Sequence, residues 1–351
     1  MEKQCIGLDI SSDSFTACLV ARSSADVLSY SPVKTFKNEK QGFQQLLRFK
    51  RSSGLKDKQV VFLMEATGVY HEKVANFLHD LGETVHIVLA NTSKHYFKSL
   101  NTKTKTDAVD ARLLGRFGIE RDHRVWTPPS TLMLKLKGLV RFKLQLQDQK
   151  TAMCNIQHSK DRAHGTPVQV IRATKRVLKV LEDQISGIEK EIERVISEEP
   201  ELEKKVADIC TTGGLGAQTV AGVLAETDCF TLFTSAKQLA SYAGYDVVHN
   251  ESGTIKGATR ISKKGNRYIR RMMYLPAMSA SRCVPEFVAL RTRIREKSGI
   301  PMKAQVAIQR KLLILLYTLW KNGTQYEEGY YKNKVARAKA QATQDSALAL
   351  P

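Results

Sequence analysis

The sequence lacks paired cysteines. Its six cysteines are scattered along the chain, and no two of them are spaced as CxxC. Structural zinc sites take their ligands from such close pairs, and disulfide frameworks occur in short secreted chains rich in cysteine. The pattern argues against both kinds of site and predicts a cytoplasmic protein in a reducing compartment. The residues are Cys5, Cys18, Cys154, Cys210, Cys229 and Cys283.

Long apolar runs are also missing. The longest, LLILLYTLW at 312–320, is far shorter than the roughly 20 residues that cross a bilayer. It predicts a buried helix with Gly323 as its C-cap. The first residues, MEKQCIGLDI, enter a strand directly and show no signal-peptide core. We therefore expect no membrane partner.

Acidic residues are too few to balance the basic ones. The chain has 55 Lys and Arg against 35 Asp and Glu, a net charge of +20 and a pI near 9.7. This excess favours a polyanionic partner, and nucleic acid is a better fit than a membrane surface because no basic amphipathic anchor helix stands out. A merely basic protein is the plain alternative. With 351 residues, 42% of them hydrophobic, two or three domains can form.

The first 125 residues predict an α/β domain. The pattern gives strands at 4–10, 15–22 and, more weakly, 26–31, then helix 40–50, strand 59–64, helix 70–82 and strand 85–90. A basic, Thr-rich loop, KSLNTKTKT, follows, and Thr104 or Thr106 can cap the next helix. The order βββαβαβα is that of the RNase-H-like fold.

The residues after 125 are predicted to be mostly helical, apart from the end of the chain. Residues 126–200 predict an arm with a heptad pattern broken once, by Thr174. Either a coiled coil, within or between subunits, or a plain antiparallel hairpin with 132–155 fits this pattern. The region 201–332 predicts a mostly helical domain, and 333–351 a disordered tail. The heptad residues are Ile171, Leu178, Leu181, Ile185, Ile188, Ile192 and Val195.

A glycine-rich turn opens the third region, in TTGGLGAQTVAGVLAE. Such a turn before a helix presents backbone N–H groups that suit phosphate, as in helix-hairpin-helix motifs. A simple interhelical loop explains it equally well.

Four carboxylates stand where this fold would bring them together. Asp9 lies in the apolar run CIGLDI and Glu65 ends VVFLMEATG, while Asp107 and Asp110 lie three apart on one helix. Neighbouring strand ends and one helix face would let them share a pair of divalent ions. Because all ligands are hard oxygens, Mg²⁺ is the expected ion. Each residue alone also has a structural reading, such as Asp107 at a helix N-terminus.

A second constellation is HNESGTIKGATRISKKGNRYIRR at 249–271. Ser252 lies in a polar turn, beside cations that could stabilise charge on phosphorus. From chemistry alone Ser252 is one of several candidate nucleophiles, the others being Ser241, Ser262 and Ser279. The expected nucleic-acid contacts are Lys103, Lys105, Lys256, Arg260, Lys263, Lys264, Arg267, Arg270 and Arg271, of which the last three share a helix face.

Four segments resemble the insertion-sequence one-ten family of DEDD transposases: GLDIS, MEATGVY, TKTDAVDARLL and ESGTIKGATRISKKGNRYIRR. That family includes RNA-guided recombinases and the pilin-gene invertase, and the resemblance covers about 4–325. It implies a RuvC-like domain, a coiled-coil arm and a transposase domain. One departure is TTGGLG, where the family commonly has a proline before GIG.

Carried over by position, the family's acidic quartet falls on Asp9, Glu65, Asp107 and Asp110, and its catalytic serine on Ser252. The resemblance further implies a transient phosphoserine link to DNA and a site shared between subunits of a dimer or tetramer. It also implies a structured, non-coding bridge RNA that pairs with donor and target DNA. A nucleoid-associated DNA recombinase is thus the expected function.

Two other functions remain open from the sequence. One is a RuvC-type nuclease in which metal-activated water cuts DNA and Ser252 is incidental. The other is a non-enzymatic scaffold for nucleic acid, although a pure binder gains nothing by placing anions beside phosphates.

Overall fold

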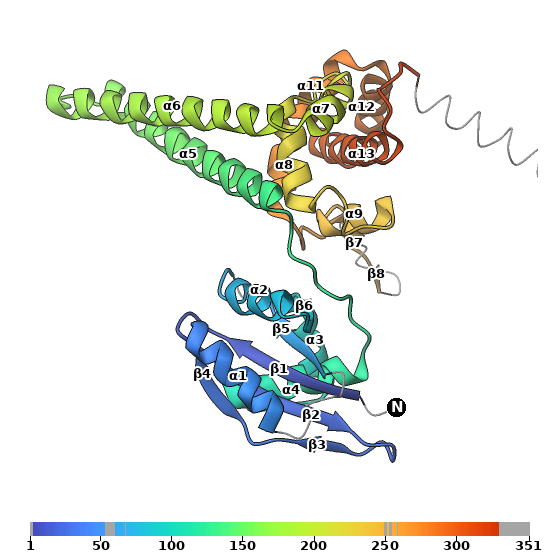
Figure 1. Cartoon of the computed structure of the whole chain (residues 1–351). Helices are drawn as coiled ribbons and strands as arrows, with labels where there is room; N and C mark the ends of the chain where they lie inside the picture. The colour runs from blue at the N-terminus through green and yellow to red at the C-terminus, as the bar shows by residue number, and fades with distance from the viewer. Residues whose placement is uncertain are drawn as a thin grey trace, which may run out of the picture. The chain divides into compact units, whose positions relative to one another are not determined.

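The chain divides into two compact units, 1–128 and 129–351. The structure, a computed structural model, describes residues 3–52, 60–66, 68–248, 251–252, 255–257 and 259–329, and of 251–252 and 255–256 it describes the backbone alone. Each unit is described by itself below (Figure 1). The sequence predicted four segments. Here the arm and the third region share one hydrophobic core, and the predicted tail, 333–351, lies outside the described residues.

The first unit is a mixed sheet with helices on both faces. Its strands are β1 (Lys3–Ile10), β2 (Ser14–Arg22), β3 (Leu28–Tyr30), β4 (Lys34–Lys37), β5 (Val60–Glu65) and β6 (Thr84–Val88). Its helices are α1 (Lys40–Ser52), α2 (Glu72–Asp80), α3 (Ala90–Ser99) and α4 (Asp107–Glu120). The strand order is β3-β2-β1-β5-β6, with β4 also paired to β2. The pairs β1–β5 and β5–β6 are parallel and β1–β2 is antiparallel, as in an RNase-H-like sheet.

The predicted strands and helices of this unit are confirmed, with ends that differ by a few residues, and two elements were missed. The strand β4 is only four residues long, KTFK, and pairs with β2 alone. The helix α3, ANTSKHYFKS, is mostly polar and buries only Ser93 and Tyr96. Neither segment has enough apolar residues to show a period.

Alternation along β1 divides the core into two layers. Ile6, Leu8 and Ile10 join the cluster that includes buried residues of α1 and α2. Cys5 points the other way, into the cluster that includes Tyr96 of α3 and Leu114 of α4. Since side chains alternate across a strand, Gly7 and Asp9 share the face of Cys5. The odd-numbered residues of β1 therefore face α4.

The helix α4 approaches this face closely because glycines meet there. A Cβ on Gly7 would lie 2.2 Å from the carbonyl oxygen of Ala111 and 2.2 Å from the backbone nitrogen of Gly115. One turn further on, a Cβ on Gly118 would lie 2.3 Å from the sulfur of Cys5. Backbone therefore packs on backbone, and the first turn of α4 lies over the carboxyl end of β1.

The second unit is mostly helical. Its helices are α5 (Thr131–Arg162), α6 (Val168–Ser197), α7 (Pro200–Cys210), α8 (Ala217–Thr227), α9 (Ala236–Tyr242), α10 (Arg267–Met272), α11 (Tyr274–Cys283), α12 (Pro285–Ser298) and α13 (Pro301–Asn322). Short strands lie between α9 and α10: β7 (Val247–Val248), β8 (Glu251–Ser252), β9 (Ile255–Lys256) and β10 (Arg260–Ile261). The predicted apolar helix is α13, which contacts α7, α9, α11 and α12 and ends at Gly323 with φ 63°.

The predicted arm is a long helical hairpin of α5 and α6, with its root packed on α8 (Figure 1). Of the heptad residues only Ile192 and Val195, at the root, are buried, and the others are half-buried. Thr174 is buried, and its hydroxyl donates to the carbonyl of Val170 at 2.8 Å. Within one chain, the arm is thus the antiparallel hairpin of α5 and α6. A coiled coil with another subunit stays a prediction.

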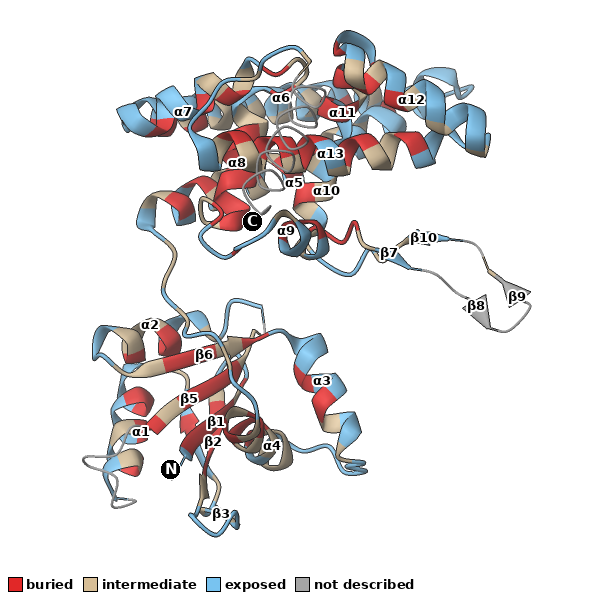
Figure 2. Ribbon diagram, turned by 90° about the vertical axis from the view of Figure 1, so that its right-hand side faces the viewer, coloured by how far each residue is buried: buried red, intermediate tan, exposed pale blue. Residues whose placement is uncertain are grey.

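Burial is concentrated where α8 and α13 meet their neighbours, while much of α6 and α12 is exposed (Figure 2). Among the described residues, no helix is both long enough and apolar enough to cross a membrane. All six cysteines are free thiols.

We expect Gly7→Ala to destabilise the chain by about 3 kcal/mol, because the added methyl group forces α4 away from β1. The matched control is Gly138→Ala in α5, where nothing lies within 4 Å of the new Cβ. That change should stabilise by about 0.5–1 kcal/mol through helix propensity. Urea unfolding of the full chain measures both. Equal effects at the two positions would contradict the close contact of β1 and α4.

Candidate functional site

Asp9 and Glu65 lie at the carboxyl ends of two adjacent parallel strands. The register of β1 and β5 runs to the pair Leu8–Met64, and each carboxylate is the next residue along its strand. Both side chains lie on the face covered by α4, because they follow Gly7 and Leu63 by two positions. Both residues are half-buried.

Asp107 and Asp110 belong to the first turn of α4. The helix begins there because the side chain of Thr106 accepts a hydrogen bond from the Val109 backbone at 3.3 Å, as an N-cap does. Asp107 is exposed and Asp110 half-buried. The contact of α4 with Gly7 brings this turn to the end of β1, where Asp9 lies.

Electrostatics shows that the four carboxylates interact. Burial, followed by the charges of Asp110, Asp107 and Glu65, raises the pKa of Asp9 to about 6, while Lys105 opposes the rise. Burial also raises the pKa of Asp110, again against the pull of Lys105. Like charges held this close repel one another, and a cation between them would relieve that repulsion.

The side chains do not form a finished metal site. Within the residues that the structure describes, no group of three or more Asp, Glu, His or Cys side chains is arranged to hold an ion. The donor set still fits a hard cation, since it consists of carboxylates alone and their mutual repulsion raises the pKa of Asp9. The four carboxylates that the sequence singled out thus interact electrostatically, but their side chains are not arranged as the ligands of a metal ion.

Sequence reasoning missed Ser93 in α3. Its fully buried hydroxyl donates a 2.8 Å hydrogen bond to Oε2 of Glu65 and so holds that carboxylate in place. The only signal was a serine in a polar segment after β6, which gives no reason to expect a buried contact. Lys105 was expected to bind nucleic acid, and it is exposed with its charge close to Asp9 and Asp110. Lys103 is also exposed.

Ser252 lies in the second unit, on a short hairpin. Its backbone pairs with Ile255, and Glu251 pairs with Lys256, so β8 and β9 form an antiparallel ladder. Nearer the helices, β7 pairs with β10. Figure 2 shows β7 and β10 leaving the body of the unit side by side. The side chains of Ser252 and Lys256 lie outside the described residues.

The two ends of this serine segment, 243–266, are fastened together. The Asn266 backbone donates to the carbonyl of Tyr242 at 2.7 Å, and Lys263 donates to the carbonyl of Gly244 at 3.1 Å. Gly265 has φ 149°, and a Cβ there would lie 2.3 Å from the oxygen of Tyr242. Only glycine fits such a position.

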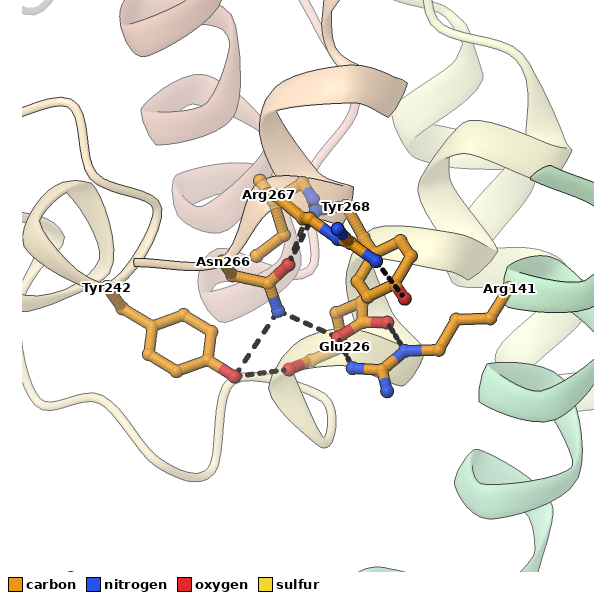
Figure 3. Close-up of polar contacts among 7 residues, drawn as sticks. Arg141, Glu226, Tyr242, Asn266, Arg267 and Tyr268 are labelled. Atoms are coloured by element: carbon orange, nitrogen blue, oxygen red, sulfur yellow. Dashed lines mark hydrogen bonds and ion pairs between the residues drawn. The ribbon is translucent and has the colours of Figure 1, made fainter. Parts of the chain in front are cut away.

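A buried carboxylate anchors these ends to the helices (Figure 3). Glu226, at the end of α8, is 2% exposed and accepts two hydrogen bonds from Arg141, at 2.6 and 2.8 Å. It also accepts one from the Asn266 side chain at 2.7 Å. The other end of that amide caps α10. The Arg141 guanidinium stacks on the ring of Tyr268 at 4.4 Å.

The three arginines of α10 have different surroundings. Arg270 donates to the carbonyl of Ala243 at 2.8 Å, and Arg271 pairs with Asp148 at 2.5 Å. Arg267 is exposed, lies over the Tyr268 ring and donates to the hydroxyl of Tyr268 at 3.2 Å. The protein itself therefore engages all three, and phosphate binding by this face stays a prediction. Arg260, Lys263 and Lys264 are exposed.

Comparison with known proteins identifies the family of this chain. Residues 6–159 match the model of the IS110 DEDD transposase, described as "Transposase", and residues 207–291 match "Transposase IS116/IS110/IS902 family". The chain belongs to the IS110 family of DEDD transposases. This is the insertion-sequence one-ten family that the motifs resemble, and the two matches contain the acidic quartet and Ser252 respectively.

Curated relatives of this IS110-family chain span nearly its whole length. The pilin gene-inverting proteins of Moraxella bovis and Moraxella lacunata are each 29% identical over 334 residues, or 93% of this chain and 99% of theirs. A probable family 20 transposase of Pseudomonas aeruginosa is 23% identical and covers 76% of this chain and 85% of its own. The solved T. thermophilus RuvC in complex with Holliday junction substrate is 11% identical, with a TM-score of 0.26, over 35% of this chain and 99% of RuvC.

We expect Asp9→Asn to stabilise this IS110-family protein when no divalent ion is present. Because the pKa of Asp9 is about 6 in the folded chain, above its ordinary 3.8, the folded state binds the extra proton and gains stability as pH falls through 6. At pH 7.5 Asp9 is ionised, and its partial burial beside other carboxylates lowers the free energy of unfolding. The neutral asparagine of the variant removes this cost, which is about 1 kcal/mol after solvent screening, or roughly 2–4 °C in Tm.

Thermal unfolding with a chelator, from pH 5 to pH 8, measures this effect. The gain should shrink toward pH 5, and Mg²⁺ should raise the Tm of the unchanged chain more than that of the variant. Asp13→Asn, at an exposed carboxylate near the same strand end, is the control and should change nothing. A destabilised Asp9 variant at pH 7.5 would contradict the repulsion.

A second prediction concerns the anchor below the serine segment. Arg141→Met should destabilise by about 3 kcal/mol, since it leaves the buried Glu226 carboxylate without its cation. Adding Glu226→Gln should recover part of the loss by removing the charge. Arg194→Met, in an exposed pairing with Glu191 and Glu198, should have little effect. Urea unfolding measures all of these, and equal losses at Arg141 and Arg194 would count against a buried anchor.

Proposed function

We propose that this chain is a DNA recombinase of the transposase type, which cuts and rejoins DNA. The observation that carries the proposal is the electrostatic contact of Asp9 with Glu65, Asp107 and Asp110 at one end of the sheet. A chain that only bound nucleic acid would be weakened by anions gathered next to phosphates. The pilin gene-inverting relatives, which align over 93% of the chain, support the same function.

In this proposal Asp9, Glu65, Asp107 and Asp110 hold Mg²⁺, as two ions. When bound, Mg²⁺ polarises the scissile phosphate and stabilises the leaving oxygen. The protein supplies the frame: Gly7 lets α4 come close enough, and Ser93 fixes the Glu65 carboxylate at 2.8 Å. Lys105 limits the repulsion until the ions bind.

Ser252 is the proposed nucleophile. Its hydroxyl oxygen attacks phosphorus, so that a serine–phosphorus bond forms while the bond from phosphorus to one deoxyribose oxygen breaks. The serine proton ends on the released DNA hydroxyl. A hydroxyl of the recombining strand then attacks the phosphoserine, which restores the serine and a phosphodiester. One ester replaces another at each step, so the reaction needs no external energy source.

The charge of the chain supports the proposed partners. A net charge of +20 suits a chain that holds a structured guide RNA together with donor and target DNA. Exposed cations occur in both units, at Lys103 and Lys105 in the first and at Arg260, Lys263 and Lys264 in the second. We further propose a homo-oligomer in which one subunit's carboxylates serve another subunit's serine.

The test is covalent capture of DNA. The full chain is expressed with its natural flanking DNA, the reaction is stopped with denaturant, and protein–DNA adducts are measured. Ser252→Ala should abolish the adducts and recombination, because no other group replaces the attacking oxygen. Asp9→Asn and Glu65→Gln should abolish recombination as well.

Ser279→Ala is the matched control, at an exposed serine of α11, and it should retain adducts. Ser262→Ala checks a competing hydroxyl on the same segment. Adducts that persist in Ser252→Ala would refute the assigned nucleophile. Metal-dependent cleavage with free DNA ends and no attached protein would instead identify a RuvC-type nuclease.

A further inference from the structure

A pocket of about 250 Å³ lies among α11, α12 and α13, helices that Figure 1 shows together in the second unit. Three guanidinium groups line it: Arg282 from α11 and Arg291 and Arg295 from α12. Arg291 and Arg295 are four residues apart, so they project from one face of their helix. The helices α11 and α12 pack on one another and on α13, which fixes the pocket walls.

These arginines differ from others nearby because none has a partner among the described residues. No hydrogen bond or ion pair joins any of the three side chains to another residue in the described part of the chain. A cavity of about 770 Å³, which Tyr274 also lines, is basic as well, but its cations are engaged. There Lys143 pairs with Glu189 at 3.1 Å, Lys150 with Glu182 at 2.9 Å, and Arg271 with Asp148 at 2.5 Å.

The surroundings offer little negative charge to neutralise the three arginines. From Tyr274 to Asn322 the chain has nine Lys and Arg and two acidic residues, a net of 9 − 2 = +7. One of those acids, Glu286, accepts a hydrogen bond from Tyr326. The other, Glu296, is exposed on α12. Cations held together without counter-charge repel one another, and an anion bound among them gains most where that repulsion is greatest.

The remaining walls are mostly apolar and partly exposed. Tyr274 is 39% exposed and Met302 54% exposed, and Met278 and Pro301 lie beside them, with Ser281 and Gln305 as the polar members. An aromatic ring with neighbouring methionine and proline offers a flat surface on which a nucleobase stacks, while arginines grip its phosphate. In a duplex the faces of the bases are covered by their neighbours, so both features are used together only by an unpaired nucleotide.

We propose that this pocket binds an unpaired nucleotide of a single-stranded segment, with its phosphate among Arg282, Arg291 and Arg295 and its base against Tyr274. The proposal rests on the proposed function only for the class of partner, nucleic acid. It is independent of Ser252, since it concerns binding and not strand cleavage. Single-stranded DNA and single-stranded RNA share the required chemistry, and the test separates them.

The test measures anisotropy of fluorescent oligo-dT and oligo-U with the full chain over a range of salt. The variant is Arg282→Gln/Arg291→Gln/Arg295→Gln. The matched control, Arg293→Gln/Lys297→Gln/Lys303→Gln, removes the same charge from exposed positions of α12 and α13 outside the pocket. Loss of three phosphate contacts should flatten the slope of log affinity against log salt by about 2, and the control should keep its slope.

Stacking is tested separately. Tyr274→Leu should weaken single-strand binding about tenfold without changing the salt slope, whereas Tyr274→Phe should bind as before. A duplex of the same length should bind the chain and the Tyr274→Leu variant alike. Stronger binding of oligo-U than of oligo-dT identifies RNA as the source of the nucleotide, and the reverse order identifies DNA.

Several results would overturn the proposal. They are equal losses in the pocket variant and its control, equal losses of duplex and single strand in Tyr274→Leu, or no binding of either oligonucleotide. Binding of a phosphopeptide in place of both oligonucleotides would also overturn it. If the triple variant does not fold, Arg282→Gln/Arg295→Gln, at two exposed positions, gives the same comparison. Failure of adduct formation by Ser252 would leave these results unchanged.

Discussion

The close packing of α4 on β1 is the constraint on which the candidate site depends. Gly7 and Gly115 let the two backbones meet with no side chain between them. The distance is therefore set by backbone atoms, which cannot adjust as a leucine or methionine would. Asp107 and Asp110 are brought to the end of β1 by this contact. Burial and the repulsion from Asp107 and Asp110 that this contact creates together help to raise the pKa of Asp9 to about 6.

Repulsion of this kind is unfavourable for folding, and the rest of the first unit has to compensate for it. Two apolar layers do so, one on each face of the sheet. Ser93 and Lys105 act more locally, since one hydrogen-bonds a carboxylate and the other lowers the pKa of two of them. The frame is thus stable enough to hold these carboxylates close together despite the cost of partly burying charged groups.

The sequence predicted most of the frame but less of the contacts. Apolar runs such as QVVFLM identified β5, and the carboxylates at the ends of such runs do come within electrostatic reach of one another, because strand ends and helix starts follow local rules. Ser93 could not be predicted, because its partner Glu65 lies 28 residues away. The same holds for Arg141 and Glu226, which meet across 85 residues. The heptad residues of α6 are all at least half-buried, but a heptad pattern alone cannot state which helix covers them.

The serine segment has a further consequence for how the protein can vary. Its polypeptide leaves the helical body after Tyr242 and returns at Asn266, and a 2.7 Å hydrogen bond joins these two positions. Insertions or deletions between these two hydrogen-bonded positions leave the distance between Tyr242 and Asn266 unchanged, so the helices need not repack. How far the hydroxyl extends from the body can thus be altered by a few codons, independently of the stability of the domain that carries it.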